Sequence, residues 1–180
     1  MNLKPILYAE DEENDAFFLQ RALVQATVLN PLVVARDGQE AIDYCSGSGR
    51  FSNRDEHPLP CLVLLDLNMP RKSGMEVLKW IRNQPSISDL PVIVLTSSLQ
   101  EADIHRAYSQ GANAYLGKPS KPDELVGVIK SIKDFWRELI PSVIMRTWFT
   151  WDSALRFQTR PIPAARSRRN CKSGRSRRQG

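Results

Sequence analysis

A chain of 180 residues, 42% of them hydrophobic and 25% charged, is long enough to bury one sizeable core and predicts one domain with a short appendage. The N-terminal stretch MNLKPILYAEDEEN has one basic residue and an apolar run that acids soon interrupt, so neither a signal peptide nor a membrane anchor is expected. The three cysteines form no C-x-x-C pair and no Cys/His cluster, which argues against a disulfide framework and against a zinc site. We therefore expect a cytoplasmic globular protein.

The net charge of +5 is divided unevenly along the chain. Residues 146–180 hold ten Lys or Arg and one acid, a charge of +9, whereas residues 1–145 hold fifteen basic and nineteen acidic residues, a charge of −4. We expect the folded domain to span residues 1–142 and a basic, Arg-rich tail to span residues 143–180. The last twenty residues contain Ile162 as their one large aliphatic side chain, too little to offset the entropy of ordering, so disorder is expected there.

Five short apolar runs alternate along the chain with segments of helical spacing. The runs are rich in Val, Ile, Leu and Tyr and nearly continuous, as in strands that are covered on both faces, and they span residues 5–10, 32–36, 61–66, 91–96 and 112–117. Helical spacing of apolar residues follows each run, around residues 16–26, 41–45, 75–82, 99–111 and 125–139. Five such β-then-α units predict an α/β fold with a five-stranded, parallel, doubly wound sheet.

Polar side chains follow four of the five predicted strands. Glu10 and Asp11 follow the first strand, Asp66 the third, Thr96 the fourth and Lys118 the fifth. In open α/β sheets the functional site lies at the carboxyl ends of the strands, beside the point where the strand order reverses. All of these candidates are therefore expected at the same edge of the sheet.

The chemistry of these residues points to a metal ion and a phosphoryl group. The three acids would raise one another's pKa unless a cation lay among them, and Mg²⁺ suits their oxygens together with a backbone carbonyl near Asn68. Beside such a metal ion, Asp66 would be an ionised oxygen nucleophile. Lys118 would supply a second positive charge and Thr96 a hydroxyl donor, so the group best accommodated on Asp66 is a phosphoryl group.

Four stretches of this sequence match a known family. YAEDEEN, LLDLNMPRKSG, VLTSS and ANAYLGKPSKPDEL occur in the order, and at the strand ends, of response-regulator receiver domains of two-component signalling, which residues 3 to about 140 resemble. The resemblance implies a flavodoxin-like receiver fold in which Asp66 accepts a phosphoryl group from a histidine of a partner sensor kinase. It also implies that Lys118 contacts the phosphoryl group and that Mg²⁺ is bound by Glu10, Asp11, Asp66 and the backbone carbonyl of Asn68.

The same resemblance implies a conformational switch. Thr96 and Tyr115 would form the switch pair: phosphate would draw the Thr96 hydroxyl toward Asp66, and Tyr115 would move into the space that opens. A half-buried strand aromatic is the plainer interpretation of Tyr115. The resemblance further implies that the Lys118–Pro119 peptide bond is cis.

A narrower resemblance involves residues outside the expected site. CSGSGRFSNRDEHPLP before the third strand, DLNMPRKSG after it and the terminal FWREL resemble the single-domain regulators paired with bacterial and cyanobacterial phytochromes. This resemblance implies a phytochrome as the partner kinase and a homodimer through the fourth and fifth helices and the fifth strand. Its interface residues would be Tyr115, Phe135 and Trp136, although core packing of the last helix is an equally ordinary role for the last two.

Simpler interpretations of the acidic residues remain open. A strand-terminal Asp66 can be a turn residue or a helix N-cap, and Glu10 and Asp11 can be first-turn acids that the helix dipole favours. The coincidence of the acidic pair, the acceptor Asp, the Thr and the Lys-Pro favours the phosphoacceptor site over these interpretations.

Three functions are considered. The leading one is a single-domain response regulator that is not an enzyme, signals through phosphorylation-dependent protein–protein interaction and loses its own phosphate slowly. A Mg²⁺-dependent aspartyl-phosphate hydrolase is less favoured, because such enzymes usually carry a second catalytic Asp where this chain has Asn68. Nucleic-acid binding through the basic tail is the alternative, but the roughly forty residues after the receiver hold no recognition-helix pattern. A non-native extension is favoured over a functional basic arm, because the composition changes abruptly and the tail carries no recognisable motif.

Overall fold

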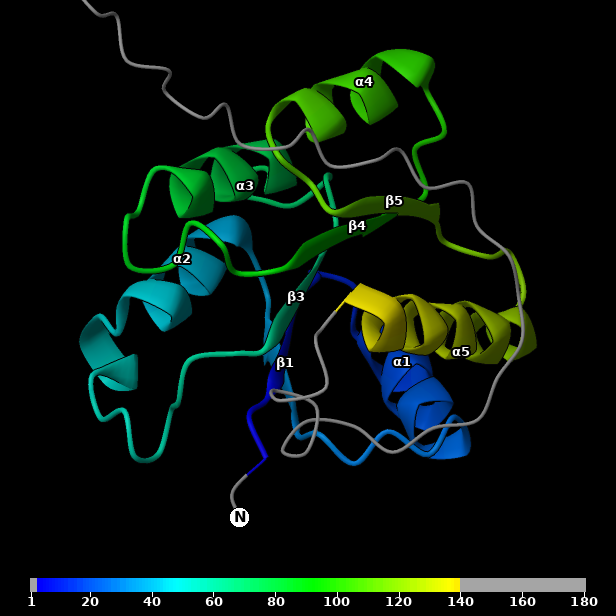
Figure 1. Ribbon diagram of the computed structural model, residues 1–180, viewed down its shortest axis with the longest axis horizontal. Coiled ribbons are helices and arrows are strands. Elements are labelled where there is room, and N and C mark those ends of the chain that lie inside the picture. Colours follow the sequence, from blue (N-terminus) through cyan, green and yellow to red (C-terminus); the bar gives the residue numbers. More distant parts are fainter. Residues whose placement is uncertain (1–2, 140–180) are drawn as a thin grey trace, which may run out of the picture.

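The computed structural model describes residues 3–139, the side chains of 135–139 excepted, and contains a five-stranded parallel sheet with helices on both faces (Figure 1). The strand order is β2-β1-β3-β4-β5, and every neighbouring pair is parallel. The strands are β1 Ile6–Ala9, β2 Leu32–Ala35, β3 Leu62–Leu65, β4 Val92–Thr96 and β5 Ala114–Gly117. The predicted doubly wound α/β sheet is confirmed.

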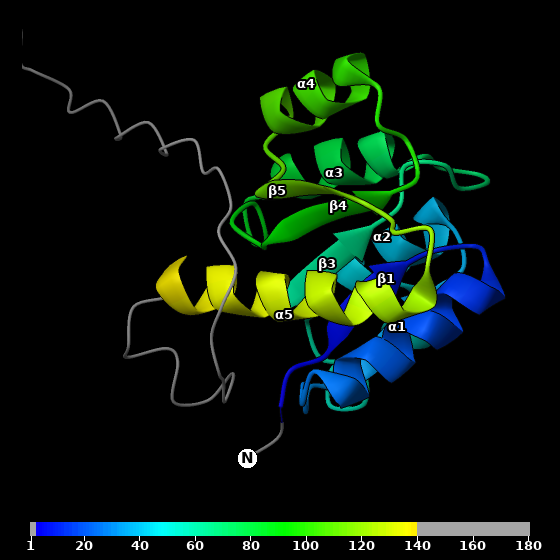
Figure 2. The same cartoon turned by 90° about the vertical axis from the view of Figure 1, so that its right-hand side faces the viewer.

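Within residues 3–139, five α-helices cover the sheet in two layers. They are α1 Glu13–Gln25, α2 Gly38–Ser46, α3 Gly74–Arg82, α4 Glu101–Ser109 and α5 Pro122–Leu139, with a short 3-10 helix η1 Gly49–Phe51 after α2. Figures 1 and 2 show α1 and α5 side by side on one face of the sheet, and α2, α3 and α4 on the other. A helix therefore follows each strand, as the alternating pattern predicted.

Alternate residues of the inner strands face the two helical layers, because successive side chains of a strand point to opposite faces. In β1, Leu7 packs in the core cluster under α2 and α3, whereas Ile6 and Tyr8 pack in the cluster under α1 and α5. The four residues of β3 divide in the same way, and all of these side chains are at most 2% exposed. Burial on both faces explains why these strands read as continuous apolar runs rather than alternating ones.

The loop between β3 and α3 turns back closely over the end of β3. A Cβ atom at position 74 would lie 2.0 Å from the carbonyl oxygen of Asp66, so glycine is required for this approach. Ser73 caps α3: its hydroxyl accepts a hydrogen bond from the Glu76 N–H at 3.4 Å, and the Glu76 carboxylate accepts one from the Ser73 N–H at 3.0 Å. Gly74 and this capping box hold the backbone that follows Asp66.

The strands are one or two residues shorter than predicted, and the polar residues Glu10 and Asp66 lie just past their ends. The strand order reverses between β1 and β3, so these two carboxylates flank the switch point of the sheet. None of the helices in the described region is long and apolar enough to cross a membrane. The predicted domain end at residue 142 and the basic tail 143–180 lie outside the described residues.

Candidate functional site

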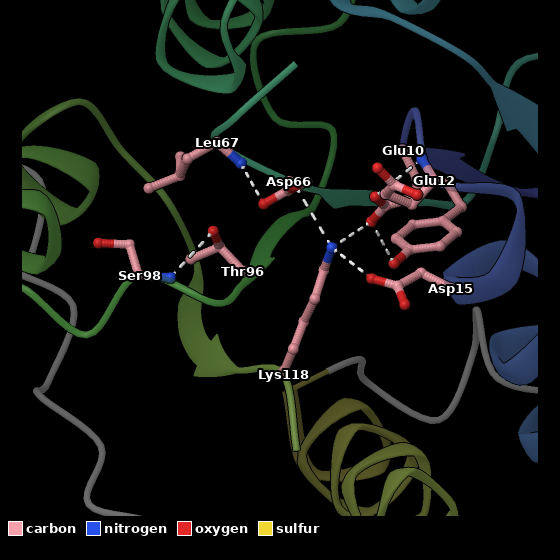
Figure 3. A network of polar contacts seen from close by, with 9 residues as sticks. Glu10, Glu12, Asp15, Asp66, Leu67, Thr96, Ser98 and Lys118 are labelled. Atoms are coloured by element: carbon pink, nitrogen blue, oxygen red, sulfur yellow. Dashed lines mark hydrogen bonds and ion pairs between the residues drawn. The ribbon is translucent and has the colours of Figure 1, made fainter. Parts of the chain in front are cut away.

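Asp66 lies at the carboxyl end of β3 with its side chain in a buried polar network (Figure 3). The residue is 4% exposed, although it carries a carboxylate. Its Oδ1 accepts a hydrogen bond from the Leu67 N–H at 2.7 Å, and its Oδ2 lies 3.3 Å from the Lys118 ammonium. One oxygen is thus held by the backbone while the other faces the cationic side of the site.

Glu10 follows β1, the neighbour of β3, and is almost completely buried. The Tyr8 hydroxyl donates a hydrogen bond to Glu10 Oε2 at 2.6 Å, and the Glu12 N–H donates to Oε1 at 3.3 Å. Burial raises the pKa of Glu10, the hydrogen bonds from Lys118 and Tyr8 partly oppose this rise, and the charge of Asp66 adds to it. The Glu10 carboxylate is therefore kept beside other charged groups at a desolvation cost, which is unusual away from functional sites.

Lys118 follows β5 and reaches across the sheet edge toward the acids (Figure 3). Its ammonium lies 2.5 Å from Glu10, 2.8 Å from Asp15 and 3.3 Å from Asp66. Burial disfavours its charge, but the hydrogen bonds to Asp15 and Glu10 and the charge of Asp66 dominate and raise the pKa of Lys118. The lysine is therefore held charged at the centre of the acidic cluster.

Glu10, Asp11 and Asp66 together could hold a metal ion. Each offers a carboxylate oxygen, and these oxygens all lie within 4.8 Å of one another. Asp11 is exposed, whereas the other two acids are buried, so the cluster is accessible from the solvent side. Anionic oxygen ligands fit a hard divalent cation, and the residues predicted as metal ligands are brought together as such a site requires. The backbone carbonyl of Asn68 as a further ligand stays a prediction.

Thr96 and Tyr115 are connected through Ser98 at the other side of β3. Thr96 is buried at the end of β4, and its Oγ1 accepts a hydrogen bond from the Ser98 N–H at 3.4 Å. The Tyr115 hydroxyl donates to the Ser98 carbonyl at 2.9 Å, and the Ser98 hydroxyl donates to Asp103 at 2.6 Å. The two predicted switch residues therefore contact the same short segment between β4 and α4.

Two expectations from the sequence are not confirmed. The Lys118–Pro119 bond was expected to be cis, but residues 3–139 contain no cis peptide bond. X–Pro bonds ordinarily prefer the trans form by about 0.5–1 kcal/mol. With this bond trans, the Lys118 ammonium still contacts the acids, and the Lys118 N–H donates a hydrogen bond to the Thr96 carbonyl at 2.8 Å. The side chains of Phe135 and Trp136 lie outside the described residues.

Asp15 belongs to the site but does not emerge from the sequence analysis. It lies in the first turn of α1, where acids are common because they interact favourably with the helix dipole. Its contact with Lys118 joins residues 103 positions apart in the chain. The spacing of Asp15 four residues after Asp11 was the one available signal, and it is too common to be specific.

The fold and the acidic site with its lysine define the class of this protein, and the comparison with protein families agrees. The family model for the response regulator receiver domain matches residues 6–130, a range that includes all the site residues described above. The chain belongs to the response regulator receiver domain family. The predicted resemblance to receiver domains is confirmed.

Individual relatives bear out the narrower resemblance as well. Response regulator Rcp1 of Synechocystis sp. is 36% identical over 137 residues, which are 76% of this chain and 91% of Rcp1. The crystal structure of Mn²⁺-bound Rcp1 has a TM-score of 0.68 and covers 77% of this chain and 97% of that one. The crystal structure of the phosphorylated cyanobacterial phytochrome response regulator RcpA is 37% identical, has a TM-score of 0.71 and covers 77% of this chain and 97% of that one. The crystal structure of the response regulator RPA3017, from red light signalling of R. palustris, is 37% identical, has a TM-score of 0.72 and covers 77% of this chain and 97% of that one.

Proposed function

We propose that this chain is a single-domain response regulator that accepts a phosphoryl group on Asp66 from a histidine of a sensor kinase. The observation that carries the proposal is the placement of the Asp66 carboxylate at the switch point of the sheet, beside a backbone donor, a charged lysine and the two other carboxylates of the cluster, Glu10 and Asp11. A buried carboxylate in such surroundings is suited to attack on phosphorus rather than to capping a turn.

The transfer requires little covalent chemistry from the protein. An Asp66 oxygen forms a bond to phosphorus while the bond from phosphorus to the kinase histidine nitrogen breaks, and the histidine leaves with the electron pair. Lys118 would then contact a phosphoryl oxygen, because its ammonium already lies 3.3 Å from Asp66 Oδ2. Leu67 N–H holds the other carboxylate oxygen and so orients the nucleophile.

Mg²⁺ is the metal ion that we propose for the cluster of Glu10, Asp11 and Asp66, with the Asn68 carbonyl as a further ligand. The oxygen ligand set supports a hard cation, and Mg²⁺ is the one that keeps waters and pairs with phosphate oxygens. When bound, it would neutralise charge on the phosphoryl oxygens during transfer. The Mn²⁺-bound form of the relative Rcp1 supports a divalent cation in this family.

Signalling rather than turnover is the proposed outcome of phosphorylation. Asn68 stands where aspartyl-phosphate hydrolases of similar fold usually carry a general acid, and an amide cannot donate a proton in that role. We expect the phosphate on Asp66 to be lost slowly by hydrolysis and no outside phosphate ester to be turned over.

The switch is proposed to run from Thr96 through Ser98 to Tyr115. If the Thr96 hydroxyl turns toward the phosphoryl group, it releases the Ser98 N–H, and the Ser98 carbonyl that holds the Tyr115 hydroxyl moves with it. Thr96→Ala should therefore still bind beryllium trifluoride, a phosphoryl mimic, but leave the Tyr115 amide nearly unshifted in NMR spectra. Thr96→Ser, which keeps the hydroxyl, should restore the shift. A full Tyr115 response in the alanine variant would contradict this coupling.

A homodimer through α4, β5 and α5 is the proposed assembly, and Tyr115, Phe135 and Trp136 are its predicted interface residues. Leu99 supports it: this side chain beside α4 is 72% exposed, and it lies over β5, where a Cβ atom at position 117 would be 2.8 Å from its Cδ2. Light scattering at tens of micromolar should show a dimer that Leu99→Ser weakens severalfold, whereas Val24→Ser, equally exposed at 72% on α1, should leave it intact. A wild-type monomer at that concentration, or equal effects of both changes, would reject this interface.

A phytochrome is the proposed partner kinase, since RcpA and RPA3017 act in phytochrome and red light signalling by their own descriptions. Phosphotransfer from each purified, radiolabelled histidine kinase of the source organism tests the proposal, and a phytochrome kinase should transfer fastest. Faster transfer from another kinase would reject the phytochrome pathway but would still support the receiver function. No transfer from any kinase would count against the receiver function itself.

We place this exchange in the cytoplasm, where kinases meet ATP. Nucleic-acid binding by the tail stays an untested alternative.

A further inference from the structure

The Lys118 ammonium lies closer to Asp15 than to the proposed phosphoacceptor. The distance from Nζ to Asp15 Oδ2 is 2.8 Å, against 3.3 Å to Asp66 Oδ2 (Figure 3). Asp15 comes from α1, whereas Asp66 follows β3, so helix and strand hold the same lysine from two directions. The lysine predicted to contact the phosphoryl group is therefore shared before any phosphoryl group arrives.

Asp15 differs from the other acids around Lys118 in its exposure. Its side chain is 38% exposed, whereas that of Glu10 is fully buried and that of Asp66 is 6% exposed. It is also not one of the acids whose oxygens all lie within 4.8 Å of one another and could hold a metal ion. Asp15 thus contacts the lysine without belonging to the metal cluster or to the core.

All three donors of the Lys118 ammonium face carboxylates in the unphosphorylated protein. An ammonium carries three N–H donors, and Lys118 has three carboxylate partners within 3.3 Å. A phosphoryl group on Asp66 can take over the donor that now faces Asp66 Oδ2, but the ammonium can bring a second donor to that group only if Glu10 or Asp15 releases it. Release of Glu10 would leave a buried carboxylate without its cation, whereas released Asp15 regains water, so Asp15 is the partner that is displaced at lower cost.

We propose that Asp15 is a positioning residue that holds Lys118 in the unphosphorylated protein and opposes occupancy of the phosphoryl position. The inference rests on the proposed phosphoacceptor function of Asp66. Two effects of the Asp15 charge act in the same direction: it competes for the ammonium, and it repels the negative phosphoryl group. Asp15 thereby lowers the affinity of the resting site for a phosphoryl group and sets how readily the regulator becomes active.

Binding of beryllium trifluoride with saturating Mg²⁺, measured by titration calorimetry, tests this role without phosphoryl transfer. Asp15→Asn should bind the mimic roughly two- to fivefold tighter than wild type, the range expected for one partly exposed charge pair. Asp15→Glu, which keeps the carboxylate, should bind like wild type. If Asp15 only stabilises the fold, Asp15→Asn should instead lower the melting temperature and leave binding of the mimic unchanged or weaker.

Glu13→Gln is the matched control for charge. Glu13 and Asp15 are both acids of the first turn of α1, but Glu13 pairs with Arg36 instead of Lys118. Glu13→Gln should leave the affinity near that of wild type. Equal tightening by both changes, or weaker binding by Asp15→Asn, would overturn the proposal, and Asp15→Ser serves in its place if the first variant does not fold. Failure of wild type to bind the mimic at all would instead reject the proposed phosphoacceptor site.

Discussion

Asp66→Asn should abolish uptake of a phosphoryl group from acetyl phosphate in the presence of Mg²⁺. Wild type should gain one phosphoryl group, visible in the intact mass, and the variant should gain none, because an amide oxygen is a far weaker nucleophile than a carboxylate. The side chain keeps its shape, and Lys118 keeps Glu10 and Asp15 as partners, so the fold should persist. The expected loss is complete within detection.

Asp55→Asn is the control for this substitution. Asp55 is an exposed loop residue, and its replacement makes the same chemical change away from the site. This variant should be phosphorylated at the wild-type rate. Equal labelling of Asp66→Asn and Asp55→Asn would mean that the phosphoryl group resides elsewhere, and melting curves of both proteins exclude unfolding as the cause of a loss.

Mg²⁺ should raise the stability of the wild-type protein substantially, and chelation by EDTA should reverse the gain and stop phosphorylation. A cation among three carboxylates relieves their repulsion, and a ligand at about 100 times its dissociation constant adds about 2.7 kcal/mol to the free energy of unfolding. Asp11→Asn should lose most of this gain. Without Mg²⁺ the same variant should be at least as stable as wild type, because one repelling charge is gone.

Glu12→Gln separates a metal ligand from a nearby charge. Glu12 is the exposed neighbour of Asp11 and does not belong to the cluster of Glu10, Asp11 and Asp66. Chemical denaturation with and without Mg²⁺ should give this variant the wild-type gain. Mg²⁺ that stabilises Asp11→Asn as much as wild type would show that the ion binds elsewhere.

The edge of the sheet that carries the site could be predicted from the sequence, because parallel strands place their carboxyl ends together. Glu10, Asp66 and Lys118 follow three different strands and meet within ion-pair distance, although the last two are 52 positions apart. The strand pattern was decisive here, since β1 and β3 are buried on both faces and leave no ambiguity with a surface helix. The predicted ends of the strands differ from the observed ends by up to two residues.

Contacts that depend on packing between distant elements could not be predicted. Asp15 has the same sequence signal as any first-turn acid, and only the placement of α1 beside the segment after β5 brings it to Lys118. The path from Thr96 to Tyr115 runs through the Ser98 backbone, which carries no side-chain signal in the sequence. The cis isomer expected after Lys118 was an inference from resemblance alone, and it was wrong.

The most direct test is to locate the phosphoryl group on the full chain. Wild-type protein is phosphorylated by its kinase or by acetyl phosphate, treated with borohydride, which reduces an aspartyl phosphate to homoserine, and digested for peptide mass spectrometry. We predict conversion of Asp66 and of no other aspartate. Unmodified Asp66, with phosphate found on His57, His105 or a hydroxyl side chain, would contradict it.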